Sequence, residues 1–392
     1  MVTKTKLPLP TEKQTTAWAK YDAMESGLRN YWYPVLRTKA VGSKPISIKL
    51  FDEQIMFVRD RASGKVFAVR DRCLHRGTPL SFGMQDFPGT FSCIYHGWCY
   101  DLATGELRAA LTDGPNCRIA GKVRIRTYPV EERAGLVFIY MGEGPPPPVE
   151  EDIPEELLEP GRIMCYRITV QAGNWRFAVE NHFDDAHAQY LHRSGIFSFF
   201  WHIPAYKTGI KVVREGKWLD RQFDKLYWEA DYPGLGHWPK VRWWKRRGYL
   251  KVKIRMPGVG GVYYNEFDAY KFHVPIDERK FYFVQVLTKK LPAWRKPIFW
   301  LQYWLYRRWA YHVQFNNQDV LMTKYSHTGP ERLFGPDVAL VAWRKMCVSE
   351  VRQADGGLTH QTPSDAVEIS GSIPPEESGN IRPPEETVQL PA

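Results

Sequence analysis

The sequence predicts an α+β protein of two domains, in which an N-terminal all-β domain is followed by a domain of antiparallel strands and helices. Its 392 residues exceed the length usual for one domain. Short runs of Val, Ile, Phe and Tyr between turn residues fill the first part, while strand and helix periodicities both occur later. Apolar residues make up 44% and charged residues 25%, which excludes a chain that is disordered throughout.

The N-terminal all-β domain is expected over residues 31–145, after an N-terminal helical segment at 1–30. Residues 54–58 and 66–69 are strand-like and flank a turn that contains Gly64, which predicts a hairpin. A second hairpin is expected where residues 98–100 lead through Gly105 into the next run. Antiparallel pairing is therefore expected throughout this domain.

The second domain is expected over residues 156–350. Four consecutive prolines and an acidic run precede it and predict an exposed linker at 146–155. Beyond the linker, residues 174–192 have helical spacing, 252–287 alternate as strands do, and 296–324 are again helical with Pro297 near the start. The polar, proline-rich residues 351–392 are expected to form a flexible tail.

Charge and cysteine content narrow the class of protein. The formal net charge of +11 is compatible with nucleic acid, an anionic membrane or an acidic protein partner. Six cysteines in so long a chain do not resemble a secreted disulfide framework, and the start lacks an apolar signal segment. We therefore expect a cytoplasmic protein whose cysteines are reduced thiols or metal ligands.

Two short motifs combine cysteine with histidine. The first is Cys73-Leu74-His75, and the second, after seventeen intervening residues, is Cys93-Ile94-Tyr95-His96. Two thiolates and two imidazoles are the ligands of a Rieske-type [2Fe-2S] cluster, in which the imidazoles raise the reduction potential. A Cys₂His₂ zinc site is the alternative, but zinc fingers usually pair like ligands around a helix, whereas these pairs are mixed and lie between strand-like runs.

These motifs, with the Arg76-Gly77 and Gly97-Trp98 that follow them, resemble the Rieske domain of ring-hydroxylating oxygenases. The resemblance implies a terminal oxygenase α subunit with one [2Fe-2S] Rieske cluster and one mononuclear Fe(II) per subunit. The resemblance extends from about residue 28 to 345. Within this range the sequence looks most similar to the carbazole 1,9a-dioxygenase branch of the family. The remaining cysteines fit neither motif and are interpreted as ordinary thiols: Cys99, Cys117, Cys165 and Cys347.

A second site is indicated by the histidines of the segment 181–192. His187 and His192 are candidates for the imidazoles of a two-histidine, one-carboxylate iron site. Their spacing places them about 140° apart on an ideal helix, so a distortion or a helix end is needed to bring them to one metal. In an arbitrary helix such histidines would more often be solvated or core residues.

The resemblance assigns roles around these histidines. Asp184, His187 and His192 match the Asp-x-x-His-x-x-x-x-His pattern of the family's catalytic domain. The family takes its carboxylate ligand from a later helix, which favours Asp319 over Asp268 and Asp277.

Asp184, with Asp185 as the alternative, would link an iron-binding histidine to a cluster histidine, here His96, across a subunit boundary. The resemblance therefore implies a homotrimer.

The expected activity is that of an oxygenase in a multicomponent system. The resemblance implies a ferredoxin and a reductase that pass NAD(P)H-derived electrons to the cluster, O2 as co-substrate and an apolar aromatic or heteroaromatic substrate. Carbazole-type angular dioxygenation is the first expectation, although the branch is expected to have three residues between its iron-binding histidines and this chain has four. An oxidative O- or N-dealkylating monooxygenase is the alternative, and a Rieske electron carrier without its own substrate is a weaker one. Residues 197–206 and 256–272 are expected to line the pocket.

Two further stretches bear on partners. Residues 238–247 mix cations with aromatic rings, but a surface insertion is the preferred interpretation and no nucleic-acid partner is expected. Residues 298–309 are rich in aromatic side chains and predict either a buried helix or an interfacial one that contacts lipid. A core helix is the preferred interpretation, and peripheral membrane contact stays open as the alternative, since an apolar substrate could enter from lipid. These residues are too short an apolar stretch to span a bilayer.

Overall fold

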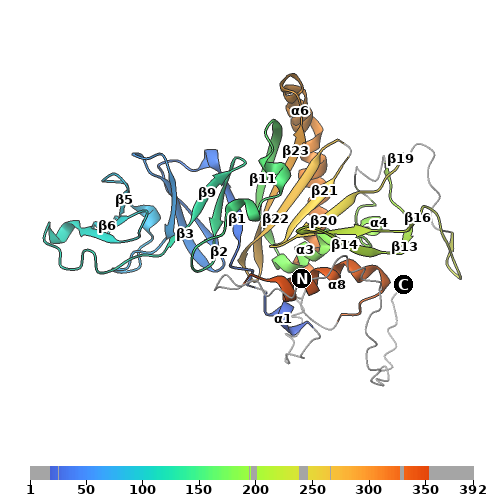
Figure 1. The fold of residues 1–392 in the computed structure, drawn as a ribbon, viewed down its shortest axis with the longest axis horizontal. Coiled ribbons are helices and arrows are strands. Elements are labelled where there is room, and N and C mark those ends of the chain that lie inside the picture. Colours follow the sequence, from blue (N-terminus) through green and yellow to red (C-terminus); the bar gives the residue numbers. More distant parts are fainter. Residues whose placement is uncertain are drawn as a thin grey trace, which may run out of the picture.

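Three small antiparallel sheets form one end of the molecule, and a seven-stranded sheet with its helices forms the other (Figure 1). The computed structural model describes residues 18–24, 26–193, 195, 201–237, 246–264, 266–326 and 331–352. The α+β class and the order of its two parts agree with the expectation from the sequence. The predicted tail from residue 353 onward and residues 238–245 of the basic stretch lie outside the described residues.

The first part consists of short antiparallel strands. One sheet has the order β1 (Trp32–Arg37), β10 (Leu136–Tyr140), β9 (Val130–Arg133). A second has the order β2 (Ile46–Leu50), β3 (Glu53–Arg59), β4 (Val66–Arg70), β8 (Thr127–Tyr128). The third has the order β5 (Thr90–Ser92), β6 (Trp98–Asp101), β7 (Leu107–Ala110). Three single-turn 3₁₀ helices connect them: η1 (Thr38–Ala40), η2 (Leu80–Phe82) and η3 (Leu111–Asp113). Both predicted hairpins are confirmed, as β3–β4 and β6–β7.

Strand β3 lies between two separate cores. Ile55 and Phe57 face the large core that extends into the second part of the molecule, while Met56 and Val58 face a smaller core. Because successive side chains of a strand point to opposite faces, a strand buried on both faces is apolar without alternation. The smaller core also holds Cys73 and Cys93, so the sheet of β3 supports the turns that carry both cysteines.

The second part is built on a seven-stranded sheet. Its order is β11 (Arg162–Ala172), β23 (Lys280–Lys290), β22 (Asp268–Asp277), β21 (Val259–Tyr263), β20 (Lys251–Arg255), β15 (Trp218–Gln222), β14 (Lys211–Glu215). The pairing is antiparallel throughout, and the longest ladder joins β11 to β23 from Arg162–Lys290 to Ala172–Lys280. Three two-stranded pairs lie beside it: β12 (Trp201–His202) with β19 (Arg246–Arg247), β13 (Tyr206–Thr208) with β16 (Lys225–Tyr227), and β17 (Asp231–Tyr232) with β18 (Gly236–His237).

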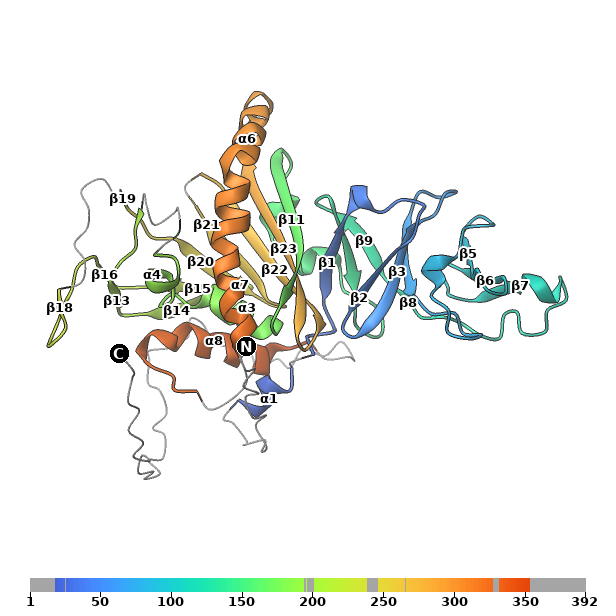
Figure 2. The same ribbon diagram turned by 180° about the vertical axis from the view of Figure 1, so that it is seen from behind.

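Helices cover one face of this sheet, as Figure 2 shows. Among the described residues the first helix is α1 (Ala19–Asp22), and η4 (Val149–Glu151) and α2 (Glu155–Leu158) precede the sheet. The helices of this part are α3 (Trp175–Phe183), α4 (Ala188–Leu191), α6 (Lys296–Gln302), the π-helix η6 (Tyr303–Phe315), α7 (Asn316–Tyr325) and α8 (Val338–Glu350), with the short turns η5 (Ala293–Arg295) and η7 (Gly335–Asp337). Of these, α3, α7 and α8 contact the sheet, and α6 projects beyond its end. Helix α3 contacts β22 and α7, so it is held between the sheet and the later helix. The helical prediction for 296–324 is confirmed, although much of it is wound as a π-helix.

Two expectations need correction. The helix expected over 174–192 is broken, because Asp184 adopts an extended conformation (ψ 142°) after α3 and only the short α4 follows. The segment expected to be an exposed linker is exposed at its first prolines, but Val149, Asp152 and Ile153 are buried. Asp152 accepts a hydrogen bond from the Trp32 backbone and forms an ion pair with Arg352, which attaches this segment to the first sheet and to the residues that follow the last helix.

The aromatic segment at 298–309 also differs from its interpretation as a core helix. Phe299, Tyr303 and Arg307 are buried, but Leu301 and Leu305 are exposed, and so are the tryptophans of the same segment. The helix therefore packs on one side only. Within the described ranges, no helix combines the length and apolar character needed to cross a bilayer.

Candidate metal centres

The two cysteine–histidine motifs form two turns with the same backbone pattern. The Gly77 N–H donates to the Cys73 carbonyl at 2.9 Å, and the Gly97 N–H donates to the Cys93 carbonyl at 3.0 Å. Both glycines have positive φ (77° and 62°), a conformation that costs other residues about 1–2 kcal/mol. Each cysteine N–H also donates back across its turn, to the carbonyl of Thr78 or Trp98. The two turns therefore present their side chains in matching ways.

Burial separates the thiols from the imidazoles. Cys73 and Cys93 lie in the smaller core, whereas His75 and His96 lie at the surface with their Nδ1 atoms 3.1 Å apart. The Tyr100 hydroxyl lies 3.3 Å from the Cys73 sulfur, and the His75 ring stacks on Trp98. Burial and the neighbouring Cys73 raise the pKa of the Cys93 thiol. Two inner sulfurs and two outer imidazoles form the donor set for a [2Fe-2S] centre, with its histidine side toward solvent.

The other cysteines lie apart from these turns. Cys99 is buried on β6, Cys165 on β11 and Cys347 on α8, and Cys117 is partly buried in the loop after η3. Burial raises the pKa of Cys165 to about 12, so this thiol is held in its protonated form. Their interpretation as ordinary thiols is compatible with these positions.

The break between α3 and α4 resolves the spacing problem of His187 and His192. His187 is the residue before α4, and His192 is the residue after it. The two histidines thus flank a single turn of helix instead of lying along a regular one, and their rings are 5.4 Å apart between centroids. Asp184 initiates the break, because its carboxylate accepts hydrogen bonds from the N–H groups of Ala186 and His187.

Asp319 on α7 completes a three-residue cluster. Its Oδ1 lies 3.1 Å from His192 Nε2 and 3.5 Å from His187 Nε2. Among the residues that the structure describes, His187, His192 and Asp319 form the one group of potential metal ligands whose donor atoms all lie within 4.8 Å of one another. All three side chains are at most one-fifth exposed. Two imidazoles and one carboxylate are the donor set of non-heme Fe(II) sites.

The outer nitrogens of both imidazoles have partners. His187 Nδ1 lies 3.0 Å from Asp184 Oδ2, and His192 Nδ1 lies 3.0 Å from Gln318 Oε1. An imidazole whose Nδ1–H donates to an oxygen keeps a lone pair on Nε2, and this arrangement orients metal-binding histidines. Gln318 was missed by the sequence interpretation, although it is adjacent to Asp319.

The electrostatics of this cluster favour a cation. Burial alone would lower the pKa of His187, but hydrogen bonds to Asp184 and Asp319 raise it to about 9. Burial would raise the pKa of Asp319, yet the two histidines and Lys271 hold it well below its ordinary value. A buried cluster whose carboxylates stabilise positive charge on an imidazole would also stabilise a metal ion between the same atoms.

The weaker candidates are engaged elsewhere. Asp268 pairs with Arg162 at 2.9 Å and Asp277 with Lys49 at 3.1 Å, both away from the histidines. Asp185, the alternative to Asp184, pairs with Arg221 at 2.7 Å and with Lys207. Asp184 is therefore the aspartate of this pair that contacts an imidazole of the cluster.

A pocket opens beside the three-residue cluster. Of the walls expected from sequence, Ile203, Pro204 and Val262 line it, while residues 197–200 lie outside the described residues. Phe315 and Tyr249 add apolar and aromatic surface that the sequence did not identify. Lys207 also lines the pocket, and burial lowers its pKa to about 6. The open surface of the pocket is thus mostly apolar, although about half of its lining residues are polar or charged, among them Asp185, Arg221 and Lys271.

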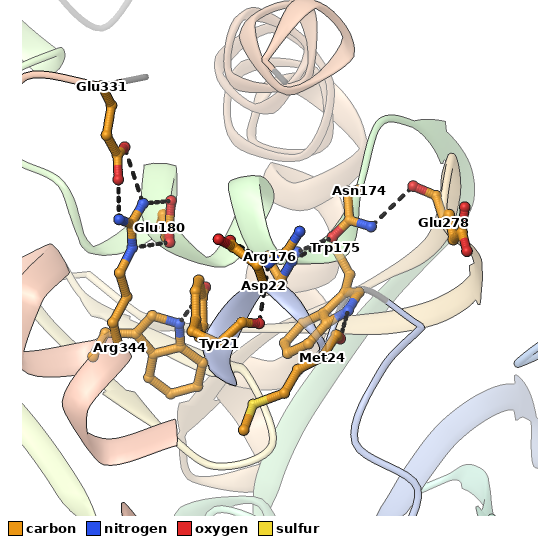
Figure 3. A network of polar contacts seen from close by, with 11 residues as sticks. Tyr21, Asp22, Met24, Asn174, Trp175, Arg176, Glu180, Glu278, Glu331 and Arg344 are labelled. Atoms are coloured by element: carbon orange, nitrogen blue, oxygen red, sulfur yellow. Dashed lines mark hydrogen bonds and ion pairs between the residues drawn. The ribbon is translucent and has the colours of Figure 1, made fainter. Parts of the chain in front are cut away.

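A buried polar network anchors α3, which leads into the cluster (Figure 3). Asn174 caps the helix by accepting from the Arg176 N–H at 3.1 Å, and Arg176 pairs with Asp22 of α1. One turn later, Glu180 accepts two hydrogen bonds from Arg344 of α8, at 2.7 and 3.1 Å. Helix α3 is therefore fixed at both ends before Asp184 turns the chain.

The two candidate centres lie at opposite ends of the molecule. The turns of Cys73 and Cys93 adjoin β5 and β6 at one end of the long axis, whereas α4 lies near the other (Figure 1). Each candidate centre nevertheless has all of its proposed ligand residues in the same chain.

Comparisons with known proteins support a Rieske domain in the first part of the chain and a ring-hydroxylase domain after it. Residues 31–129 match the model of the Rieske [2Fe-2S] domain, and residues 140–205 match that of the homotrimeric ring hydroxylase. The terminal oxygenase component of carbazole 1,9a-dioxygenase from Sphingomonas sp. is 30% identical over 368 residues, which cover 86% of this chain and 95% of that protein. The Rieske match favours an iron–sulfur cluster over zinc at the first centre.

Solved structures show the same similarity. The terminal oxygenase of carbazole 1,9a-dioxygenase from Novosphingobium sp. KA1 superposes with a TM-score of 0.76 at 27% identity, covering 86% of this chain and 96% of that one. The oxygenase in a reduced complex with ferredoxin in carbazole 1,9a-dioxygenase has a TM-score of 0.75 at 28% identity, covering 88% and 96%. The chain therefore belongs to the Rieske ring-hydroxylating oxygenases, as the terminal oxygenase component of a multicomponent system.

Proposed function

We propose that this chain is the oxygenase of a carbazole-type angular dioxygenase, with the [2Fe-2S] cluster on Cys73, His75, Cys93 and His96 and one Fe(II) on His187, His192 and Asp319. The observation that carries this proposal is that the donor atoms of His187, His192 and Asp319 all lie within 4.8 Å of one another. Fe(II) in such a site supplies dioxygen activation with electrons delivered through the cluster.

The residues around the second centre have separate tasks in this proposal. Asp184 and Gln318 hold the two imidazoles with Nε2 toward the metal, because each carries an oxygen 3.0 Å from an Nδ1 atom. The apolar pocket walls bind an aromatic ring system and limit water beside the reacting atoms. Carbazole is the substrate proposed first, since the relatives that match along nearly their whole length are named for it.

Electron transfer is proposed to occur between subunits of a homotrimer. The opposite positions of the two centres in one chain support this arrangement, as does the match to the homotrimeric ring hydroxylase model. His96 of one subunit would approach Asp184 of the next, and Asp184 already contacts His187. A ferredoxin would dock at the exposed histidine side of the cluster, with a reductase and NAD(P)H upstream, as the ferredoxin complex of the related oxygenase suggests.

The ligand assignment is tested by metal analysis of Asp319→Ala. The variant is expected to lose the mononuclear iron while the visible and electron paramagnetic resonance signals of the reduced cluster remain. Asp277→Ala is the matched control, because that carboxylate pairs with Lys49 away from the histidines. Full iron content or full turnover in Asp319→Ala would reject the assignment.

Transfer between subunits is tested with mixed trimers. Cys93→Ser subunits, which lack a complete cluster site, are co-expressed with Asp319→Ala subunits, which lack the iron carboxylate. Each variant alone is expected to be inactive, and the mixed trimer active, because the intact cluster of one subunit then serves the intact iron site of its neighbour. An inactive mixture with normal trimer assembly and metal content would favour transfer within one subunit.

The reaction is tested by incubation with ferredoxin, reductase, NADH and carbazole under ¹⁸O-labelled dioxygen. Angular dioxygenation adds both oxygen atoms of O2 and consumes two electrons and two protons, so the product carries two labels. Release of an aldehyde from an O- or N-alkyl substrate in the same assay would instead indicate the dealkylating monooxygenase. Consumption of neither substrate class by the metal-loaded trimer would reject both activities.

A further inference from the structure

The end of the helical rod formed by α6 and η6 carries an apolar face that is open to solvent. Six side chains make up this face, which we call the tip face, and each is between 51% and 71% exposed: Trp294, Ile298, Leu301, Trp304, Leu305 and Trp309. The opposite side of the same rod is packed, since Phe299, Tyr303 and Arg307 are buried. A contiguous exposed apolar patch of this kind often marks a site that contacts another protein or a membrane.

The tip face lies at a projecting edge of the molecule. Figures 1 and 2 both show α6 beyond the end of the seven-stranded sheet, and Figure 2 shows the helical rod leading back from α6 over the sheet to α7. The ladder of β11 and β23 ends nearby in sequence at Lys290. A projecting apolar tip can contact a flat surface without interference from the rest of the protein.

The segment that carries the tip face is basic, although Glu266 pairs with its buried Arg307 and Glu159 pairs with Lys290 at the end of β23. No aspartate or glutamate occurs between Glu278 and Asp319, and the same stretch contains eight basic residues: Arg279, Lys280, Lys289, Lys290, Arg295, Lys296, Arg307 and Arg308. Two of them are exposed beside tryptophans of the tip face, with the Arg295 guanidinium 5.0 Å from the Trp294 ring centroid and that of Arg308 5.3 Å from Trp304. Two tip faces could not pair with each other without repulsion between like charges.

This combination is that of a helix lying in a membrane interface. Tryptophan is enriched at the boundary between headgroups and acyl chains, where its ring is apolar and its N–H is polar. Arginine and lysine beside an apolar helix face attract anionic headgroups. We propose that the tip face rests on the surface of a bilayer rich in anionic phospholipid, with its apolar side chains at the acyl boundary and Arg295 and Arg308 at the phosphates.

The proposal does not depend on the assigned reaction or on the metal ligands. The tip face is formed by the outer side of the rod, whereas the cluster of histidines and Asp319 adjoins α7 at the rod's other end. A contact with the bilayer surface would place the enzyme beside the acyl chains, in which apolar compounds concentrate.

The test is co-sedimentation of the full-length, metal-loaded enzyme with vesicles of phosphatidylcholine, with and without phosphatidylglycerol. The enzyme is expected to bind the vesicles that contain phosphatidylglycerol, and binding should weaken as salt is raised. Arg295→Gln/Arg308→Gln should weaken binding roughly 25-fold, since each basic residue near an anionic surface contributes about fivefold. Lys44→Gln/Lys65→Gln is the charge-matched control, because these exposed lysines lie on the first part of the chain.

The apolar contribution is tested with Leu301→Ser/Trp304→Ser/Leu305→Ser, which should weaken binding at least about 30-fold. Leu235→Gln/Val170→Gln, two exposed apolar residues elsewhere, should bind as the unaltered enzyme does. Cluster absorbance and the thermal midpoint confirm folding, and the exposed arginine pair supplies an independent variant if the triple variant is unstable.

Two results would overturn the proposal. The unaltered enzyme could fail to bind anionic vesicles, or both tip variants could retain full binding, which would place the contact elsewhere. In the first case, analytical ultracentrifugation would show whether the triple variant has changed its subunit number. Such a change would identify the tip face as a contact between copies of this chain.

Discussion

Replacing Arg344 by methionine should destabilise the catalytic part of the molecule strongly. Arg344 and Glu180 are 5% and 7% exposed and are joined by two hydrogen bonds, and Arg344 also pairs with Glu331. Burial opposes the charge of Arg344, but Glu180 and Glu331 raise its pKa above the ordinary value. Methionine fills much of the same volume and leaves the Glu180 carboxylate buried without its cation.

The magnitude follows from the cost of an uncompensated buried charge. Removing one partner of a buried ion pair typically costs about 3–5 kcal/mol. At roughly 2–4 °C per kcal/mol for a part of this size, the thermal midpoint should fall by about 6–20 °C. The loss of stability should be smaller in the double variant Glu180→Gln/Arg344→Met than in Arg344→Met alone, because Glu180→Gln removes the carboxylate charge that would otherwise be unpaired.

Thermal unfolding followed by calorimetry measures this effect, with Arg133→Met as control. Arg133 pairs with Glu131 and Glu150, but all three side chains are at least 40% exposed. Such a surface pair contributes at most about 1 kcal/mol. If Arg344→Met lowered the midpoint no more than Arg133→Met, the buried network of Figure 3 would not be what holds α3 in place.

Three further predictions concern other parts of the structure. Gln318→Leu removes the oxygen that lies 3.0 Å from His192 Nδ1, so the affinity for the mononuclear iron should fall about 10–100-fold in a chelator competition; unchanged affinity would mean that Gln318 does not orient the imidazole. Gly97→Ala places a Cβ 3.0 Å from the Leu111 side chain at a residue with φ 62°, so it should lower the cluster content measured by visible absorbance. Gly64→Ala is the control, because Gly64 has a similar φ of 69° but open space around it. This control should reduce stability and leave the cluster content unchanged. Burial lowers the pKa of His312 to about 3, below the value near 6.5 of an unfolded histidine. The unfolded chain therefore binds the proton first as pH falls, so His312 should cost about 2 kcal/mol of stability between pH 7 and pH 5. His312→Asn should make denaturant-measured stability less dependent on pH in this range, and an unchanged dependence would contradict the assigned burial effect.

The residues proposed as cluster ligands could be predicted from the sequence because each pair of them lies on one turn. Cys73 with His75, and Cys93 with His96, are close in the chain, and Gly77 and Gly97 supply the positive φ that each turn needs. Local geometry of this kind is encoded by neighbouring residues. The hairpins β3–β4 and β6–β7 were predictable for the same reason.

The geometry of the second centre required the tertiary structure. The spacing of His187 and His192 conflicted with a regular helix, and only the packing of α3 between the sheet, α7 and α8 shows where the chain breaks. The position of Asp319 beside them was expected from family resemblance and could not be derived from spacing. Gln318 was not anticipated, because its role depends on which face of α7 meets α4.

The sequence by itself therefore determined the class of the protein, its strand-rich first part and the four residues proposed as cluster ligands, since these depend on contacts between near neighbours. Only the tertiary structure decided that Asp319 lies 3.1 Å from His192 and that Leu301 and Leu305 remain outside the core. The apolar pattern of a helix does not reveal whether another element covers it. Burial and convergence are properties of packing between distant segments, and periodicity within one segment cannot specify them.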